Sequence, residues 1–195
     1  MQQVRTWHWI SSALCLIGLL LFAGTGITLN HAGQIEGHET VTTRRAQAPP
    51  AVLALLATQE GADAPIPNDV SSWLGRALGV ETRGRKAEWS PEEVYVALPQ
   101  PGSDAWLTLH RRSGAVEYEK TTRGAVALFN DLHKGRNAGA AWGWFIDIFA
   151  GACLLFALTG LWLLQLHAKA RRATWPLVAG GLAIPLIVAL LFLHL

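Results

Sequence analysis

The chain has 195 residues, of which 51% are hydrophobic and 15% charged, and its formal net charge is +2. This composition is too apolar for an ordinary soluble domain, and its charges are too concentrated in the middle of the chain for a bare bundle of membrane spans. Basic and acidic residues are mixed in that central part, which argues against a nucleic-acid partner.

Three apolar stretches each exceed the roughly 20 residues that cross ~30 Å of hydrocarbon. They cover Trp9 to Leu29, Ala140 to Leu166 and Trp175 to Leu195. The first could instead be a cleaved signal peptide, but it is longer than the usual apolar core of ~7 to 15 residues and lacks a clean small-x-small cleavage site. We expect it to be retained. The predicted organisation is an N-terminal region with the first span (1–30), an extramembrane α+β domain (31–139), a second span (140–167), a loop (168–174) and a third span (175–195).

The positions of basic residues predict the topology. Lys169, Arg171 and Arg172 lie in the loop between the second and third spans, and Arg5 precedes the first span. The positive-inside rule places both segments in the cytoplasm, so the central domain is outside. We therefore expect a multi-pass protein of a bacterial inner membrane, with a cytoplasmic N-terminus and a periplasmic central domain bordered by the lipid bilayer.

The central part predicts a small α+β domain. Prolines open an apolar helix over 51–58, and a second helix, capped at residue 68 or 69, ends at Gly79. Alternating apolar residues then predict antiparallel strands, and a helix over 124–132 leads to the second span. The alternating residues are Val94, Val96 and Leu98, then Ala105, Leu107 and Leu109, then Val116 and Tyr118.

The first two spans contain a short internal repeat. Residues 21–27 read Leu-Phe-Ala-Gly-Thr-Gly-Ile, and residues 155–161 read Leu-Phe-Ala-Leu-Thr-Gly-Leu. Each copy is followed within seven residues by a histidine. Shared apolar composition could also produce this match, but if it is a true pair, the two copies run in opposite directions across the membrane.

Histidines gather at the ends of the spans. The topology places His8 and His167 at the cytoplasmic surface and His31, His133 and His194 at the outer surface. Imidazole is a good axial ligand for haem iron, and helix bundles commonly hold planar cofactors. Two b-type haems would then bind between His31 and His133 on the outer side and between His8 and His167 on the inner side. The alternative is that interfacial histidines, like the tryptophans near them, simply sit where the chain meets lipid headgroups.

Helical geometry restricts this hypothesis. His8 and His31 are 23 positions apart, about 140° around a straight helix, so His31 must lie beyond the helix end or the helix must bend. His133 must lie on the helix that approaches the second span. Lys134 and Arg136 beside it could pair with haem propionates or serve as ordinary membrane anchors.

Other candidate residues are less informative. Asp147 is a carboxylate at membrane depth, and it could handle protons or make a packing hydrogen bond. The role of His194 as a further outer candidate stays open. No Ser-His-Asp set, zinc motif or phosphate loop is present, so hydrolase functions have no support.

The order of four short stretches resembles the PepSY-associated transmembrane family. These stretches are Trp7 to Leu14, Thr25 to His31, Trp106 to Val116 and Leu132 to Gly135. The resemblance implies a periplasmic PepSY-like α+β unit between spans. It also implies kinship with larger haem-containing reductases that pass electrons to ferric siderophores. The histidines at 8, 31, 133 and 167 match the places where such relatives put ligands.

Two functions follow as hypotheses. The first is a haem b protein with two haems that moves electrons outward to a ferric siderophore or another iron chelate. Because the chain has only three spans and one short outer domain, we expect a membrane or periplasmic protein partner or a homodimer. The second is a non-enzymatic anchor whose outer domain binds or regulates a periplasmic protein.

Overall fold

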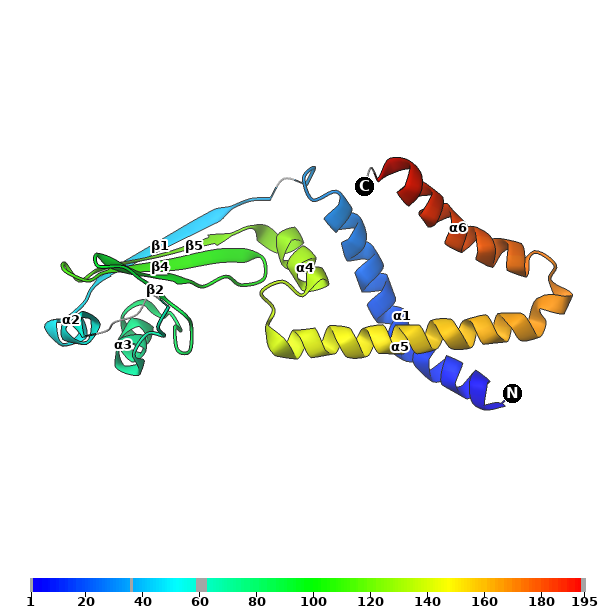
Figure 1. Cartoon of the computed structure of the whole chain (residues 1–195), viewed down its shortest axis with the longest axis horizontal. Helices are drawn as coiled ribbons and strands as arrows, with labels where there is room; N and C mark the ends of the chain where they lie inside the picture. Colours follow the sequence, from blue (N-terminus) through cyan, green and yellow to red (C-terminus); the bar gives the residue numbers. More distant parts are fainter. Residues whose placement is uncertain (1, 36, 59–62, 194–195) are drawn as a thin grey trace. The chain divides into compact units, whose positions relative to one another are not determined.

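The computed structural model describes residues 2–35, 37–58 and 63–193. The chain forms two compact units, a helical unit of Met1–Leu21 with Phe145–Leu195 and a sheet unit of Phe22–Trp144. Figure 1 colours the elements along the chain. In chain order they are α1 (Gln2–Asn30), β1 (Thr40–Gln47), α2 (Pro50–Ala57), α3 (Asn68–Leu78), β2 (Glu88–Trp89), β3 (Glu93–Ala97), β4 (Ser103–His110), β5 (Ala115–Thr122), α4 (Gly124–Lys134), α5 (Gly139–His167), a short 3-10 helix (Ala168–Ala170) and α6 (Thr174–Phe192).

Three of these helices are long and apolar enough to cross a membrane, namely α1, α5 and α6. Helices α1 and α5 have 29 residues each and α6 has 19, which at 1.5 Å per residue gives roughly 44 Å and 29 Å. Their large apolar side chains face outward, as Trp162 and Leu190 show with 62% and 80% of their surface exposed. Such surfaces suit a hydrocarbon solvent, so the three predicted spans are confirmed and the chain is a multi-pass membrane protein.

Within the helical unit, α1 approaches α5 closely. A Cβ atom added to Gly18 would come within 2.2 Å of the Phe149 ring, so the absence of a side chain at Gly18 makes room for that ring. Ser11 and Cys15, one turn apart on α1, are buried in the same unit. Because residues i and i+4 share a helix face, this face of α1 is the packed one.

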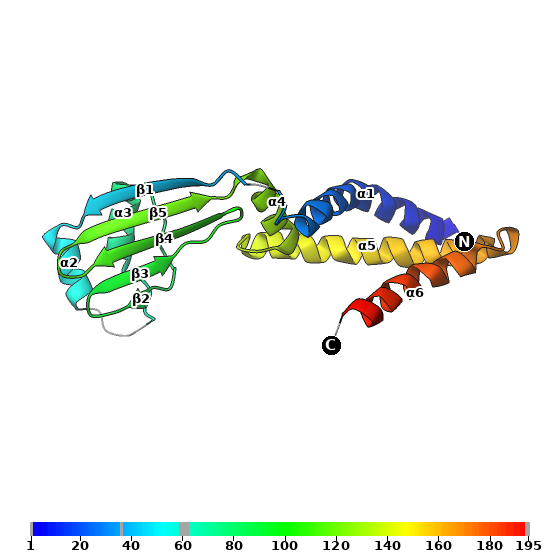
Figure 2. The same ribbon diagram turned by 90° about the horizontal axis from the view of Figure 1, so that it is seen from above.

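The sheet unit contains one antiparallel sheet with the order β1-β5-β4-β3-β2, which Figure 2 shows side by side. Leu107 pairs with Tyr118 and Leu109 with Val116 across β4 and β5. Alternate residues therefore point to one face, and the three strands predicted by alternation are confirmed.

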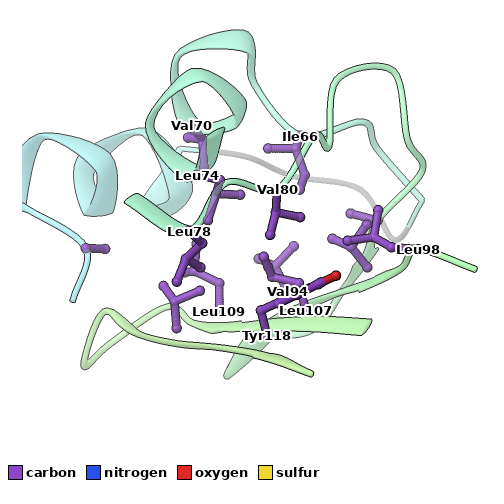
Figure 3. Packing of buried hydrophobic residues seen from close by; sticks show 14 of the residues in the cluster. Ile66, Val70, Leu74, Leu78, Val80, Val94, Leu98, Leu107, Leu109 and Tyr118 are labelled. Carbon is purple, nitrogen blue, oxygen red and sulfur yellow. The ribbon is translucent and has the colours of Figure 1, made fainter. Parts of the chain in front are cut away.

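The buried face of the sheet packs against helices. Val70, Leu74 and Leu78 lie at i, i+4 and i+8 on α3 and are at most 4% exposed, so they form one apolar stripe. Figure 3 shows this stripe above Leu107 and Leu109 of β4. Gly79 ends α3 with φ 67°, a left-handed conformation that glycine adopts without strain. The predicted helices of the α+β domain are confirmed. The predicted cap at residue 68 or 69 is wrong, because Pro67 is the N-cap and Asn68 is the first residue of α3.

Two strands at the sheet edges have no counterpart among the sequence predictions. Strand β1 pairs with β5 over eight residue pairs, yet seven of its eight residues are exposed. Strand β2 has only two residues. In β1, Ala46 packs partly buried against the core, but one such residue does not give the alternation of apolar and polar residues on which a sequence prediction depends.

Helix α4 is held against the sheet by a buried carboxylate. Asp131 is 4% exposed and accepts hydrogen bonds from the Gly102 backbone N–H and from the Arg123 guanidinium, both at 2.8 Å. At the end of α4, the Trp142 indole N–H donates to the Leu132 carbonyl at 2.8 Å. These bonds fix the helix that carries His133.

Candidate functional site

His8, on the N-terminal part of α1, is seated against one face of α5. Its Nδ1 lies 3.0 Å from the Thr159 hydroxyl oxygen, and its ring stacks on Phe156 with centroids 4.9 Å apart and planes 15° apart. A Cβ atom on Gly160 would come within 3.3 Å of the His8 ring. Because Phe156, Thr159 and Gly160 lie at i, i+3 and i+4, they share one side of α5 and together hold the imidazole.

The contacts of Thr159 favour a proton on Nδ1 of His8. The Thr159 hydroxyl donates to its own helix, toward the Leu155 and Phe156 carbonyls at 2.7 and 3.0 Å. Its oxygen is therefore an acceptor for the Nδ1–H of His8. The Nε2 atom of His8 is left with a free lone pair, which is the form of imidazole that binds a metal.

His167, at the end of α5, has the same proton arrangement. Its Nδ1 lies 2.8 Å from the Leu163 carbonyl oxygen, and a carbonyl can only accept, so Nδ1 carries the proton. Within residues 2–35, 37–58 and 63–193, no hydrogen bond reaches Nε2 of His8 or of His167.

His8 and His167 line one cavity of about 580 Å³ in the helical unit. This volume lies within the roughly 300 to 1,000 Å³ that is typical of small-molecule and cofactor sites. Small and apolar residues form much of the wall, and Arg171 adds a cation. The lining residues are His8, Gly160, Leu163, Leu164, His167, Ala170, Arg171 and Thr174. The structure thus brings together the pair of histidines that the sequence assigned to the cytoplasmic side.

His133, on α4, is seated in the sheet unit in a similar way. Its Nδ1 lies 2.7 Å from the Thr25 hydroxyl oxygen, its ring centroid is 5.0 Å from that of Phe22, and Gly26 is its close neighbour. The Thr25 hydroxyl points to the Phe22 carbonyl at 3.2 Å. As the sequence required, His133 lies on the approach helix and not in the span.

His31 lies just beyond the end of α1, as the spacing from His8 required. It is exposed, and its Nδ1 donates to the Ile27 carbonyl at 2.9 Å. Neither the cavity lined by His8 and His167 nor three others among the described residues is lined by both His31 and His133. The structure therefore groups the inner pair more clearly than the outer pair.

A second cavity, of about 310 Å³, lies beside α4 in the sheet unit. Lys134 and Arg136, the residues considered for propionates, both line it together with Arg123 and Asp131. Arg136 already lies 3.8 Å from Asp131 and 3.9 Å from Asp104. Its charge is thus partly used by carboxylates of the same unit.

The remaining sequence candidates stay apart from these sites. Asp147 is exposed on α5, and no hydrogen bond or ion pair joins its carboxylate to another described residue. His110 lies at the end of β4, 3.7 Å from the Glu93 carboxylate. His194 is outside the residues that the structure describes.

Sequence reasoning missed Thr25, Thr159 and the two phenylalanines that hold the histidines. The internal repeat was the signal that could have found them, because both threonines and both phenylalanines belong to it. The histidines that follow the repeat along the chain are nevertheless not the ones it holds. Each copy contacts a histidine from a different helix, and pairing between helices is not encoded in local spacing.

A membrane protein with three spans and an α+β insert after the first is the class that this fold defines. The family described as "Putative PepSY_TM-like" matches residues 1–194, and the chain belongs to this family. The resemblance proposed from the sequence is therefore confirmed. No curated protein and no solved structure matches the chain.

Proposed function

We propose that this protein is a b-type haem protein that carries electrons across the membrane, with one haem held between His8 and His167. The observation that carries the proposal is the 580 Å³ cavity lined by both histidines. Each presents a nitrogen lone pair that is not used elsewhere in the described part of the chain. Two neutral imidazoles are a common axial pair for haem iron.

The cavity residues fit such a group in three further respects. Leu163 and Leu164 offer an apolar wall to a macrocycle and exclude water from it. Gly160 and Ala170 allow a flat group to approach the helix backbone. Arg171 supplies a cation for a propionate, a charge-assisted pair of the strong kind. A bound haem supplies one-electron chemistry, and the protein holds and tunes it.

A second haem near the outer surface, between His31 and His133, belongs to the same proposal. It is supported by the Nδ1 contacts of these two histidines, since within the described residues no hydrogen bond reaches Nε2 of either. Lys134 is exposed, and its side chain could move to pair with a haem propionate on that side. Electrons would then pass outward to a ferric siderophore or another iron chelate, as the family resemblance suggests.

Difference spectroscopy of the purified full chain tests the proposal. We expect reduced-minus-oxidised b-type bands after expression with ample haem. His8→Ala and His167→Ala should each remove the same haem signal, and His133→Ala should remove a different one. His110→Ala is the matched control, because His110 is a strand residue paired with Glu93. Absence of b-type bands in the unmodified protein would end the redox proposal.

A second candidate function is a non-enzymatic one, in which the sheet unit binds a protein partner. It is favoured by β1, an exposed edge strand of eight residues. An extended peptide can add to such an edge by backbone hydrogen bonds. Photo-crosslinkers placed along β1 of the full chain would report this. Crosslinks to one protein at alternate positions, with no haem bands, would favour this second function over the first.

A further inference from the structure

The two threonine–histidine contacts are built from the same five-residue pattern, Phe-Ala-x-Thr-Gly. We call residues 22–26 and residues 156–160 the two histidine seats. In each seat the phenylalanine ring contacts the imidazole, at 5.0 and 4.9 Å between centroids. The threonine hydroxyl lies 2.7 and 3.0 Å from Nδ1. One seat lies wholly in the sheet unit and the other wholly in the helical unit.

The glycine of each seat adjoins the same edge of the imidazole. The nearest ring atom to a Cβ built on Gly26 is Cε1 of His133, at 3.7 Å, and the nearest to one built on Gly160 is Cε1 of His8, at 3.3 Å. A Cβ atom at position 160 would press on the ring edge that lies between the two nitrogens, whereas one at position 26 would make an ordinary van der Waals contact with it. The seats thus control the position of the ring as well as its hydrogen bond.

Both threonine hydroxyls also point the same way. Thr25 donates to the Phe22 carbonyl and Thr159 to the Leu155 and Phe156 carbonyls. A hydroxyl that has given its hydrogen to the backbone can only accept from the histidine. A plain packing contact between helices would accept either ring nitrogen, whereas in both seats Nδ1 is the nitrogen that lies against the hydroxyl.

We propose that Thr25 and Thr159 are positioning residues that hold His133 and His8 as Nδ1-protonated imidazoles with Nε2 directed to a bound ligand. The identity of that ligand as haem iron rests on the proposed function. The proton position and its dependence on the two hydroxyls do not, because they follow from contacts within the chain.

The proton position can be measured without haem. Nitrogen-15 spectra of histidine-labelled full chain, purified without haem, distinguish the two neutral tautomers. We expect the Nδ1–H form for His8 and His133. Thr159→Val and Thr25→Val keep the shape of the side chain but remove the hydroxyl acceptor. Thr159→Val should therefore shift His8, and Thr25→Val should shift His133, toward the Nε2–H form. Serine at the same position should restore the Nδ1–H form. Thr28→Val is the control, because Thr28 lies one turn from Thr25 and donates to Asn130.

The outcomes separate this inference from the proposed function. An Nε2–H form in the unmodified protein, or no change in the valine variants, overturns the role of the threonines. If the unmodified protein binds no haem, the proposed function fails and the tautomer result alone decides the inference.

With haem bound, each valine variant should bind its haem about 10- to 100-fold more weakly, as is typical when a partner of a ligating histidine is lost. The midpoint potential of the haem that still binds at the altered site should also rise. An Nδ1–H that donates a hydrogen bond makes the imidazole a stronger electron donor to ferric iron, and the valine variant loses this bond. Serine variants should recover both. Unchanged affinity and potential in the valine variants, with haem present, would contradict positioning while leaving the haem proposal intact.

Discussion

Asp131 shows how one buried carboxylate can determine where a functional helix lies. It joins the turn before β4, the end of β5 and helix α4, because it accepts from the Gly102 backbone and from Arg123. Arg136 lies 3.8 Å from the same carboxylate. His133 lies two residues further along α4, so the position of this histidine depends on the Asp131 contacts.

Replacement of Asp131 by asparagine should destabilise the sheet unit. Asp131→Asn keeps the shape but leaves the Arg123 guanidinium without its closest counter-charge, and the loss of one partner of a buried pair costs about 2 to 4 kcal/mol. Hydrogen exchange of the β4 and β5 amides in the full chain measures this. Asp104→Asn is the control, because Asp104 is 54% exposed where it meets Arg123 and exposed pairs contribute about 1 kcal/mol or less. Equal effects from both variants would contradict the assigned role.

Gly102 gives a second prediction at the scale of single residues. Its φ is 70°, and a Cβ atom there would come within 2.7 Å of the Leu128 backbone. Gly102→Ala should therefore combine backbone strain with a clash and cost roughly 2 to 4 kcal/mol. Gly84 has φ 71° but open space around it, so Gly84→Ala should show the strain alone, about 1 kcal/mol. Thermal unfolding that ranks the two variants equally would show that α4 does not press on this turn.

At the scale of elements, the sequence predicted those that bury a face and missed those that do not. Burial requires apolar residues at helical spacing on α3, namely Val70, Leu74 and Leu78, and at every second position on β4. Both elements were therefore predictable from the sequence. Strand β1 is mostly polar and exposed, with Ala46 partly buried, and it is held by backbone pairing with β5. Backbone pairing does not require a pattern of apolar and polar side chains, so the sequence pattern did not predict this strand.

The candidate site divides in the same way. The sequence proposed the histidines because they lie near the ends of the spans that it defines, and their role as ligands stays a prediction. The sequence did not predict the seats that hold these histidines, because the register between α1 and α5 decides that His8 contacts Thr159. Such register depends on close packing, as at Gly18 and Phe149, and not on any pattern within one helix.

Strand β1 should show a characteristic pattern of amide protection. As an edge strand it pairs on one side alone, so alternate N–H groups point to β5 and the others face away. We expect slow exchange at every second residue between Thr40 and Gln47 and fast exchange between them. Residue-resolved hydrogen exchange of the full chain measures this, with the central strand β4 as the control in which both sets are protected. Uniformly fast exchange along β1 would contradict the pairing.

At the scale of the whole molecule, the orientation of the spans decides which histidines can meet an electron donor. The loop after α5 carries Lys169, Arg171 and Arg172, and the positive-inside rule predicts a cytoplasmic position for it. The cavity lined by His8 and His167 would then face the cytoplasmic side, where reduced carriers are available. The reverse orientation would place that cavity outside and reverse the direction of electron flow.

Single cysteines placed on the two sides test this orientation directly. Arg112 lies in the exposed turn after β4, and Lys169 is exposed in the loop before α6. A membrane-impermeant thiol reagent should label Arg112→Cys in intact cells and Lys169→Cys only after permeabilisation. The unmodified chain, with Cys15 buried and Cys153 within α5, is the background control. Labelling in the opposite order would invert the assignment of every histidine and turn the proposed outward path into an inward one, even if both haems were present.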